Sequence, residues 1–283
     1  MDVIAPPHTP GLPLPLSGET RLYAIIGDPI AQVGSPGFFN AAFHRLGVKA
    51  VLIPVQVPAG GLEALLRGLR AVRNLDGIVV TIPHKIAVMP FLDRIEPNGC
   101  RVGAVNAIRV EKNGSWCGDN FDGVGCVRGL EKGGHRLSGR DVLIIGAGGA
   151  GRAVTHAFAD AGITRVRLCD VDEARRDELA ASLRTHHPAL QVETGLAEPE
   201  GFEVIVNCTP LGMRADDPLP VDPTRITRGS LVVDVILKPP VSRLLEEAKA
   251  RGCATQAGRA MVEGQVEAVL GFYGFPAPPP APA

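Results

Sequence analysis

A run of glycines has the residue types and spacing of a site that binds a dinucleotide. Gly146-Ala147-Gly148-Gly149-Ala150-Gly151 follows the apolar run Asp141–Ile145 and precedes a helical pattern, so a glycine-rich turn joins a strand to a helix. Gly146 permits the tight turn, Gly148 lets the backbone approach a pyrophosphate, and Gly151 allows the strand and the helix to pack closely. The N–H groups at the helix N-terminus favour an anion. The alternative is a glycine turn that binds no ligand.

An acidic residue lies where a dinucleotide site holds the adenosine ribose. Asp170 comes about 20 residues after the turn, at the end of the next expected strand, Arg165–Cys169. A carboxylate there accepts hydrogen bonds from the ribose diol and repels the 2′-phosphate of NADP, which favours NAD as the cofactor. Arg175 and Arg176 follow later and leave NADP open. The alternative role of Asp170 is to cap the helix that begins near Asp172.

The cysteines and histidines do not have the spacing of a metal site. The six cysteines form no C-x-x-C pair and have no regularly spaced histidine partners, so neither a zinc site nor a disulfide framework is indicated. We expect them to be reduced and mostly packed in the core, including Cys208, which has no base placed to activate it. The pair His186-His187 ends a polar helical pattern and is expected to be solvated. No metal is predicted.

Length, charge and hydropathy restrict the class of protein. The chain has 283 residues, or roughly two domains at about 150 residues each. Lys and Arg number 29 against 30 Asp and Glu, and a net charge of −1 gives no reason to expect nucleic acid as a partner. No apolar run approaches the roughly 18 residues of a membrane-spanning helix, and the N-terminus has no signal-peptide pattern. We therefore expect a cytoplasmic protein that binds neither nucleic acid nor a membrane.

A strand-then-helix alternation recurs along the chain and predicts parallel sheets, in two series rather than one. The first series is expected to comprise strand Arg21–Gly27, helix Gly37–Leu46, strand Ala50–Val55, helix Ala59–Val72, strand Gly77–Thr81, and a hairpin of strands Val102–Val110 and Ser115–Cys117 at the edge of the sheet. The second is expected to comprise helix Asp122–Leu130, strand Asp141–Ile145, helix Arg152–Ala161, strand Arg165–Cys169, helix Asp172–Arg184, strands Glu203–Val206 and Ser230–Val233, and helices Val241–Arg251 and Ala260–Phe272.

Several separated motifs occur in order along the chain. They are Ile26-Gly27-Asp28-Pro29-Ile30-Ala31 with Ser35-Pro36, Thr81-Ile82-Pro83-His84-Lys85, Gly103-Ala104-Val105-Asn106, Gly118-Asp119-Asn120-Phe121-Asp122-Gly123, the glycine turn, Asn207-Cys208-Thr209-Pro210-Leu211-Gly212-Met213, and Gly258-Arg259-Ala260-Met261 with Gln265. Over these motifs, from about Leu22 to Tyr273, the chain resembles the shikimate/quinate dehydrogenase family.

This resemblance implies an α/β protein of two domains. We expect an N-terminal substrate domain with a mostly parallel sheet over residues 15–121, and a C-terminal Rossmann-type dinucleotide domain over 122–255. A last helix, 256–274, is expected to return to the first domain. The proline-rich end, 275–283, is expected to be a disordered tail of polyproline type.

The resemblance also implies that Lys85 and Asp122 are the catalytic pair. Oxidation of a secondary alcohol needs a base that takes the hydroxyl proton while hydride leaves for the nicotinamide. Lys85 is expected to be that base, and Asp122 to orient the lysine and to bind the reacting hydroxyl. Without the resemblance, an ordinary surface ion pair would be the preferred interpretation.

Further residues are implied to bind the substrate and the cofactor. Thr81, Asn106 and Gln265 carry donors and acceptors for the ring hydroxyls of a polyol, and Ser35 is expected to bind the substrate carboxylate. The cofactor is expected to contact the glycine turn, Asp170, Thr209, Met213 and Gly258, with the last two on the nicotinamide side.

Four positions depart from the family's usual pattern, namely Val33, Val79, Phe121 and Leu237. Val33 and Leu237 stand where a serine and a tyrosine usually bind the carboxylate. A hydrogen bond to a charged group is worth about 1.5–3 kcal/mol, so losing two would weaken shikimate binding by roughly 10²–10⁴. We expect either a modified ring acid or a carboxylate held by other donors, such as Gln32 or Lys238.

The predicted function is an NAD-linked interconversion of a shikimate-like cyclic hydroxy acid and its ketone. The alternative, from another class, is a non-catalytic sensor of a dinucleotide or metabolite on the same fold. The presence of both Lys85 and Asp122 argues against a sensor. The family contains monomers and homodimers, and the sequence does not decide between them.

Overall fold

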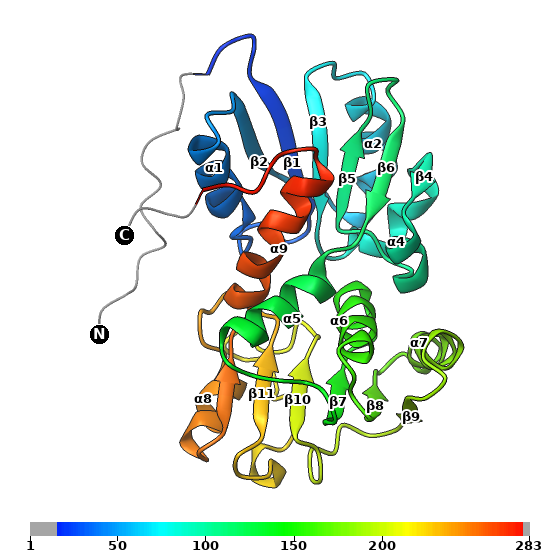
Figure 1. Ribbon diagram of the computed structural model, residues 1–283, viewed down its shortest axis with the longest axis vertical. Helices are drawn as coiled ribbons and strands as arrows, with labels where there is room; N and C mark the ends of the chain where they lie inside the picture. Colours follow the sequence, from blue (N-terminus) through cyan, green and yellow to red (C-terminus); the bar gives the residue numbers. More distant parts are fainter. Residues whose placement is uncertain (1–15, 280–283) are drawn as a thin grey trace. The chain divides into compact units, whose positions relative to one another are not determined.

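The structure, a computed structural model, describes residues 16–279, which form two compact units (Figure 1). The described part of the first unit comprises residues 16–100, 105–119 and 266–279, and the second unit comprises 101–104 and 120–265. The segment 101–104 therefore belongs to the second unit although its neighbours on both sides belong to the first. The start of the predicted first domain, residue 15, and the end of the predicted tail, 280–283, lie outside the described residues.

In the first unit, the described residues form a six-stranded sheet in the order β2-β1-β3-β5-β6-β4. Its strands are β1 (Arg21–Gly27), β2 (Ala50–Gln56), β3 (Leu75–Val80), β4 (Arg94–Ile95), β5 (Ala107–Val110) and β6 (Trp116–Asp119). β1 is parallel to β2 and β3, whereas β5 is antiparallel to β3 and β6. The short β4 is parallel to β6 and forms the edge, so the predicted hairpin is present but lies one strand inside the edge.

Apolar side chains and one amide attach helices to this sheet. The helices are α1 (Ser35–Arg45), α2 (Leu62–Leu69), α3 (His84–Ala87) and α4 (Pro97–Val102). α2 buries Leu62 and Leu66 in a core that also contains Ile26 of β1. The Asn40 side chain of α1 accepts a hydrogen bond from the Leu52 N–H (2.8 Å) and donates one to the Leu52 carbonyl (3.1 Å), which ties α1 to β2.

The second unit contains a sheet in which every neighbouring pair of strands is parallel, in the order β12-β11-β10-β7-β8-β9. Its strands are β7 (Asp141–Ile145), β8 (Arg165–Cys169), β9 (Gln191–Thr194), β10 (Val204–Asn207), β11 (Leu231–Asp234) and β12 (Ala254–Gln256). Its helices are α5 (Asp122–Lys132), α6 (Gly149–Asp160), α7 (Glu173–His186) and α8 (Arg243–Ala250), together with residues 258–265 of α9 (Gly258–Phe272).

This strand order confirms the predicted Rossmann-type fold. Counted within the unit, the order is that of a doubly wound sheet, in which the strand order reverses between the first and fourth strands. Here these strands are β7 and β10. Successive residues of β7 point to opposite faces, so that Val142 and Ile144 lie in one apolar core while Leu143 and Ile145 lie in another. Ligands of such sheets bind beyond the carboxyl ends of the strands, next to the reversal.

The predicted elements differ from the observed ones mainly where segments are short. Strands β1, β7 and β8 have the predicted bounds. The predicted strand Val102–Val110 is wrong over its first half, because α4 ends at Val102, Gly103 takes a left-handed φ of 68°, and the strand begins only at Ala107. Strands β4, β9 and β12 were not predicted, because two to four residues carry little periodicity. Nor was α4, whose residues include Pro97 and Gly99.

The residue that opens the predicted tail is packed. The Phe275 N–H donates to the Leu270 carbonyl (2.9 Å), and the Phe275 ring centroid lies 5.6 Å from that of Phe43 and 6.2 Å from that of Tyr23. These contacts all lie within the first unit. The prediction of a disordered tail therefore does not hold for Phe275.

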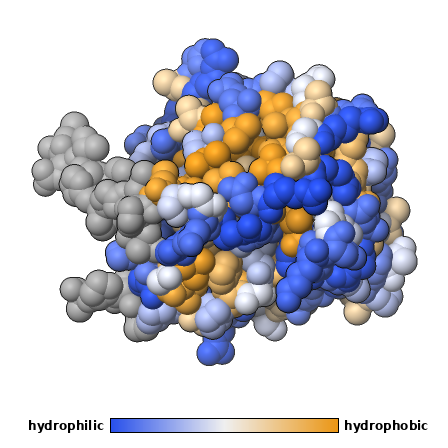
Figure 2. All heavy atoms as spheres, turned by 90° about the horizontal axis from the view of Figure 1, so that it is seen from above, coloured by the Kyte–Doolittle hydropathy of each residue, from blue (hydrophilic) through white to orange (hydrophobic). Residues whose placement is uncertain are grey.

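Three further observations concern the surface, the helices and the cysteines. On the face seen in Figure 2, hydrophilic residues surround an area where apolar residues gather. Among residues 16–279, no helix has the length and apolar composition needed to cross a membrane. All six cysteines are free thiols, and Cys117, Cys126, Cys169 and Cys253 are buried, in keeping with the expected packing role.

Candidate active site

The glycine turn lies directly after β7, beside the reversal point of the second sheet. Gly146 has a φ of +100°, in the left-handed region that favours glycine. A Cβ on Gly151 would lie 1.9 Å from the Gly146 carbonyl oxygen, so a side chain there would push α6 away from the turn. A Cβ on Gly148 would meet no atom within 4 Å. The turn is therefore closed toward the protein and open at Gly148, which fits the close approach of a pyrophosphate.

Asp170 follows β8 and is tied to the same turn. Its Oδ2 accepts a hydrogen bond from the Ala147 N–H (2.6 Å), and its Oδ1 accepts one from the Asp172 N–H (2.9 Å). The cap of α7 is Asp172, whose side chain accepts a hydrogen bond from the Arg175 N–H. The alternative interpretation of Asp170 as a helix cap is therefore wrong. Its role toward the ribose stays a prediction.

Arg152, which was not predicted from the sequence, is hydrogen-bonded to the turn. Its Nε donates to the Ala147 carbonyl (3.3 Å), and its Nη2 lies 2.6 Å from a Glu178 carboxylate oxygen. The Arg152 side chain is only 12% exposed. This guanidinium ties the glycine turn to Glu178 of α7, whose carboxylate offsets its charge. Only its position in the first turn of α6 could have signalled this contact.

The loop after β10 lies against the glycine turn. A Cβ on Gly146 would lie 2.9 Å from Thr209 Cγ2. The Thr209 hydroxyl donates to Asn207 Oδ1 (2.6 Å) and accepts a hydrogen bond from the Leu211 N–H (3.1 Å). The Met213 N–H in turn donates to a carbonyl of this loop, that of Pro210 (3.0 Å). The structure thus places Thr209 beside the glycine turn and Met213 in the same loop, and their contact with the cofactor stays a prediction.

A buried carboxyl group holds the next loop. Asp234 ends β11, and its Oδ1 accepts hydrogen bonds from the Asn207 amide (3.2 Å) and from the Ile236 N–H (3.0 Å). Its Oδ2 accepts one from the Ser242 hydroxyl (2.5 Å). Burial raises the pKa of Asp234, while the three donors favour its charged form. A Cβ on Gly258, the first residue of α9, would lie 2.4 Å from a carbonyl oxygen of this loop, so only glycine fits there.

Asp122 is the first residue of α5 and is 2% exposed. Its N–H donates to Asn120 Oδ1 (3.0 Å), and the Asn120 amide donates to the Ala104 carbonyl (3.1 Å). Asn120 therefore positions the start of α5 against the segment 101–104. Asn120 belongs to one of the sequence motifs, but the sequence did not predict a role for it.

Glycines let α5 approach its neighbours closely. A Cβ on Gly123 would lie 2.3 Å from the Ala153 carbonyl oxygen of α6. A Cβ on Gly125 would lie 2.8 Å from the Gln265 Cβ of α9. The structure therefore places Gln265 against the first turn of α5, which begins with Asp122.

In the first unit, three predicted residues lie together at one end of the sheet, namely Thr81, Lys85 and Asn106. Thr81 directly follows β3 and lies beyond its carboxyl end, whereas Ser35 begins α1, after the loop that follows β1. Asn106 directly precedes the antiparallel β5 and lies at the same end of the sheet, where its carbonyl accepts a hydrogen bond from the Val80 N–H (2.7 Å). The Lys85 carbonyl accepts the Val105 N–H (2.7 Å), and Lys85 is 8% exposed. Lys85 belongs to the first unit and Asp122 to the second, and their pairing stays a prediction.

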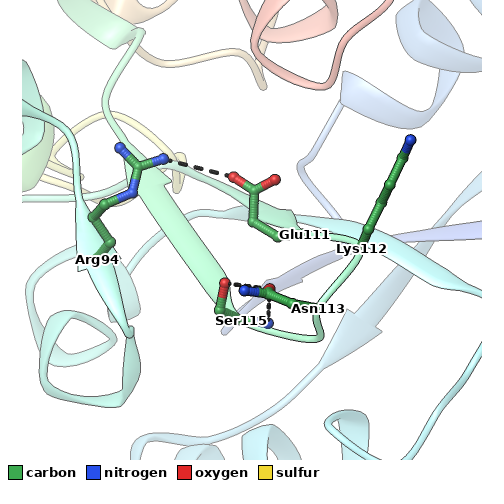
Figure 3. A pocket seen from close by; sticks show the side chains of 5 residues that line it. All are labelled: Arg94, Glu111, Lys112, Asn113 and Ser115. Atoms are coloured by element: carbon green, nitrogen blue, oxygen red, sulfur yellow. Dashed lines mark hydrogen bonds and ion pairs between the residues drawn. The ribbon is translucent and has the colours of Figure 1, made fainter.

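Five polar residues of the first unit line a hollow of about 460 Å³ (Figure 3), namely Arg94, Glu111, Lys112, Asn113 and Ser115. Asn113 Oδ1 accepts hydrogen bonds from the N–H (2.9 Å) and the hydroxyl (2.7 Å) of Ser115. The hollow lies at the turn between β5 and β6, which is the opposite end of β5 from Asn106. None of the predicted site residues lines it, so the hollow is separate from the candidate active site.

The histidines form structural contacts. His156 of α6 is fully buried, with its Nδ1 3.2 Å from His187 Nε2 and its Nε2 3.1 Å from the Ser182 hydroxyl oxygen. Burial lowers the pKa of His156 to about 3. The expectation of a solvated pair is wrong for His187, because its ring contacts the buried His156. Among residues 16–279, no group of three or more His, Cys, Asp or Glu side chains is placed to hold a metal ion.

Comparison with known proteins agrees with these features. The family model of the shikimate dehydrogenase substrate binding domain matches residues 25–108. The chain is 38% identical to a shikimate dehydrogenase (NADP(+)) of Symbiobacterium thermophilum, over 88% of this chain and 87% of that protein. The solved shikimate dehydrogenase of Aquifex aeolicus has a TM-score of 0.82 at 30% identity, covering 91% of this chain and 94% of that one.

A second solved structure is the quinate dehydrogenase of Corynebacterium glutamicum in complex with NAD. It has a TM-score of 0.78 at 28% identity, covering 92% of this chain and 95% of that one. These similarities confirm the resemblance that the motifs indicated. The chain belongs to the shikimate dehydrogenase family.

Proposed function

We propose that this protein transfers a hydride between a nicotinamide dinucleotide and a ring hydroxyl of shikimate or a close cyclic hydroxy acid. The observation that carries the proposal is that Thr81, Lys85 and Asn106 lie together at one end of the substrate-domain sheet in a member of this family. The second unit supports it with a glycine turn that is open at Gly148. A cytoplasmic location and a homodimer stay predictions.

In the proposed reaction, Lys85 Nζ takes the proton of the substrate hydroxyl as the hydride leaves the carbon that carries it. The alcohol loses one proton and one hydride and becomes a ketone. The bound nicotinamide supplies the hydride acceptor. Asp122 orients Lys85 and the hydroxyl, because a carboxylate accepts hydrogen bonds from both. In the reverse direction Lys85 returns the proton to the alkoxide oxygen.

The substrate acid is proposed to lie in a less polar environment than an ordinary shikimate site offers. Val33 and Leu237 carry no hydrogen-bonding side chain, which leaves Ser35 as the hydroxyl for the carboxylate. The Gln32 amide, a candidate replacement, already donates one hydrogen bond to the Pro29 carbonyl. We therefore propose that this protein binds unmodified shikimate weakly, or that it prefers an acid with a more apolar substituent.

For the cofactor we propose a preference for NAD. The Symbiobacterium relative is named for NADP(+), and the Corynebacterium quinate dehydrogenase was solved with NAD. In this chain Asp170 and Asp172 place two carboxylates after β8, where they would repel a 2′-phosphate. The nearby arginines are engaged locally, since Arg175 pairs with Asp172 (3.1 Å) and Arg176 with Asp177 (2.8 Å).

The experiment that tests these proposals is a comparison of kcat/KM for shikimate, quinate and related cyclic hydroxy acids with NAD⁺ and with NADP⁺. We expect a higher kcat/KM with NAD⁺, and a higher kcat/KM for a more apolar acid than for shikimate. A higher value with NADP⁺ would contradict the cofactor preference alone. Absence of turnover with every acid, despite cofactor binding, would favour the sensor interpretation.

A further inference from the structure

A buried histidine next to Lys85 bonds to a segment far from it in the sequence. His84 is the first residue of α3 and is 1% exposed. Its Nε2 lies 2.8 Å from the carbonyl oxygen of Val57, 27 residues earlier in the chain. Because a carbonyl oxygen can only accept a hydrogen bond, Nε2 carries the proton and donates it.

The carbonyl that accepts this bond is itself held in place. Val57 directly follows β2, is buried, and lies in the apolar core that also contains Ile26. Its N–H donates to the carbonyl of Gly27, the last residue of β1 (3.0 Å). The His84 ring therefore bonds to a point that is fixed by the carboxyl ends of two neighbouring strands, β1 and β2.

The helix that carries Lys85 is too short to hold its own direction. α3 has four residues, and the Val88 N–H closes its turn by donating to the His84 carbonyl (2.9 Å). A single helical turn is unstable by itself, because ordering its residues costs more than its first hydrogen bond returns. The direction of α3 must therefore come from its contacts with the rest of the first unit.

These contacts reach α3 from three neighbouring segments. The His84 N–H donates to the carbonyl of Thr81, after β3 (3.0 Å), and the Lys85 carbonyl accepts the N–H of Val105, before β5 (2.7 Å). The ring of His84 adds the contact with Val57, after β2. Successive side chains leave a helix axis about 100° apart, so a ring that is fixed at position 84 also fixes where the Lys85 side chain leaves the backbone.

We propose that His84 is a positioning residue for Lys85, and that its bond to the Val57 carbonyl holds α3 at the angle at which Lys85 Nζ takes the proton of the substrate hydroxyl. This inference rests on the proposed function, in which Lys85 is the base. A shift of about 1 Å at a reacting group can lower a rate about 10²-fold. Loss of the ring should therefore lower the rate of the chemical step more than the affinity for the substrate.

The test compares substitutions at position 84 of the full-length protein. His84→Leu cannot donate a hydrogen bond, whereas His84→Gln keeps an N–H donor at a similar reach. The matched control is Asn74→Leu, which removes the bond of the Asn74 amide to the Thr20 carbonyl (3.1 Å). Asn74 directly precedes β3 and so lies at the opposite end of that strand from Thr81.

The measurements use the cyclic hydroxy acid that the unmodified protein turns over fastest. They are the rate of the first turnover at saturating acid and cofactor, the KM for the acid, and thermal unfolding. His84→Leu should lower the rate at least about tenfold and change KM less than about threefold. His84→Gln should keep at least about a third of the rate, and Asn74→Leu should keep all of it.

A second comparison shows whether His84 acts through Lys85. When His84→Leu is added to Lys85→Ala, the residual rate should fall by less than about twofold, because the group that the ring positions is already absent. A further fall as large as that caused by His84→Leu alone would overturn the positioning role.

Three other results would overturn the positioning role alone. They are a rate within about twofold of the unmodified protein in folded His84→Leu, an equal loss in His84→Gln, and an equal loss in Asn74→Leu. If His84→Leu does not fold, His84→Asn takes its place, since its amide is one methylene shorter than that of glutamine and does not reach. Absence of turnover by the unmodified protein with every acid would overturn the proposed function, and this inference with it.

Discussion

Two glycines of the turn have different tasks. Gly151 is required by the fold, because a Cβ there would lie 1.9 Å from the Gly146 carbonyl oxygen. Gly148 has a φ of −71°, which any residue adopts, and a Cβ there would meet nothing within 4 Å. The protein itself therefore does not need glycine at position 148, whereas a ligand whose pyrophosphate approaches the backbone does.

The substitution Gly148→Ala should change the free energy of unfolding by no more than about 0.5 kcal/mol, and should weaken NADH binding by at least about tenfold, because the methyl group occupies the approach of the pyrophosphate. Gly151→Ala, its matched comparison, should lower the free energy of unfolding by about 2 kcal/mol or more. Denaturant unfolding and NADH fluorescence titration measure the two effects. Unchanged NADH affinity in Gly148→Ala would argue against a pyrophosphate at this turn.

Single residues could be predicted from the sequence where backbone geometry dictates their spacing. Gly146 and Gly151 satisfy this condition because the strand-turn-helix unit requires them at fixed offsets, and Gly148 satisfies it because an approaching pyrophosphate does. Arg152 could not be predicted, since its bond to the Ala147 carbonyl depends on the direction its side chain takes. The contact between Asn207 and Asp234 joins two strands whose pairing is a property of the whole sheet.

At the scale of elements, the close packing of α5 against α6 holds the start of α5, where Asp122 lies. A Cβ on Gly123 would lie 2.3 Å from a backbone oxygen of α6, that of Ala153. Backbone cannot move aside as the end of a flexible side chain can. The helix contact therefore depends on glycine.

Gly123→Ala should lower the free energy of unfolding by about 1–3 kcal/mol and should also lower kcat, because α5 must shift and carry Asp122 with it. Gly68→Ala is the control, since Gly68 lies in α2 with nothing within 4 Å of its Cβ position. This control should raise stability by up to about 1 kcal/mol. Equal effects of the two substitutions on unfolding would contradict the close helix contact.

The contact between α6 and α7 should make stability depend on pH. The pKa of His156 is lowered to about 3 by burial, and His187, next to it, is also lowered. Asp160, Arg101 and His186 also lie near the His156 ring and act on its charge. A histidine whose pKa is lower in the folded state binds a proton first in the unfolded state, so stability falls as the pH falls below about 6.5.

Between pH 7 and pH 5, His156 should account for a loss of about 2 kcal/mol in the free energy of unfolding. His156→Gln keeps a polar side chain but cannot be protonated in this range, so its loss over the same interval should be smaller by about that amount. Urea unfolding of both proteins at the two pH values measures the difference. An identical pH dependence in the two proteins would show that His156 does not remain neutral when folded.

Long, periodic elements could be predicted, and short ones could not. Strands β1, β7 and β8 have apolar runs of sufficient length, and the helices α6 and α9 follow a 3.6-residue pattern. β4 has two residues and exists because it pairs with β6, which sequence periodicity does not encode. Gly103 ends α4 by its left-handed φ, so the apolar residues after it had the pattern of a strand without forming one.

At the scale of the whole molecule, the restart of the strand-helix alternation predicts two units, and two sheets are present. The chain passes between the two units more than once. Residues 101–104 join the second unit through contacts such as that of the Asn120 side chain with the Ala104 carbonyl, and α9 is divided at Gln265. Such assignments depend on contacts between residues far apart in the sequence, which local pattern does not contain.

The central claim is that this chain oxidises a ring hydroxyl with Lys85 as the base. The most direct test is the rate of NADH or NADPH formation when purified protein is mixed with shikimate and NAD⁺ or NADP⁺, compared with that of Lys85→Ala. We predict turnover by the unmodified protein and a loss of at least about 10²-fold in kcat for Lys85→Ala, with thermal unfolding of the variant unchanged. Turnover that survives in a folded Lys85→Ala, or its absence in the unmodified protein with every cyclic hydroxy acid tried, would contradict the claim.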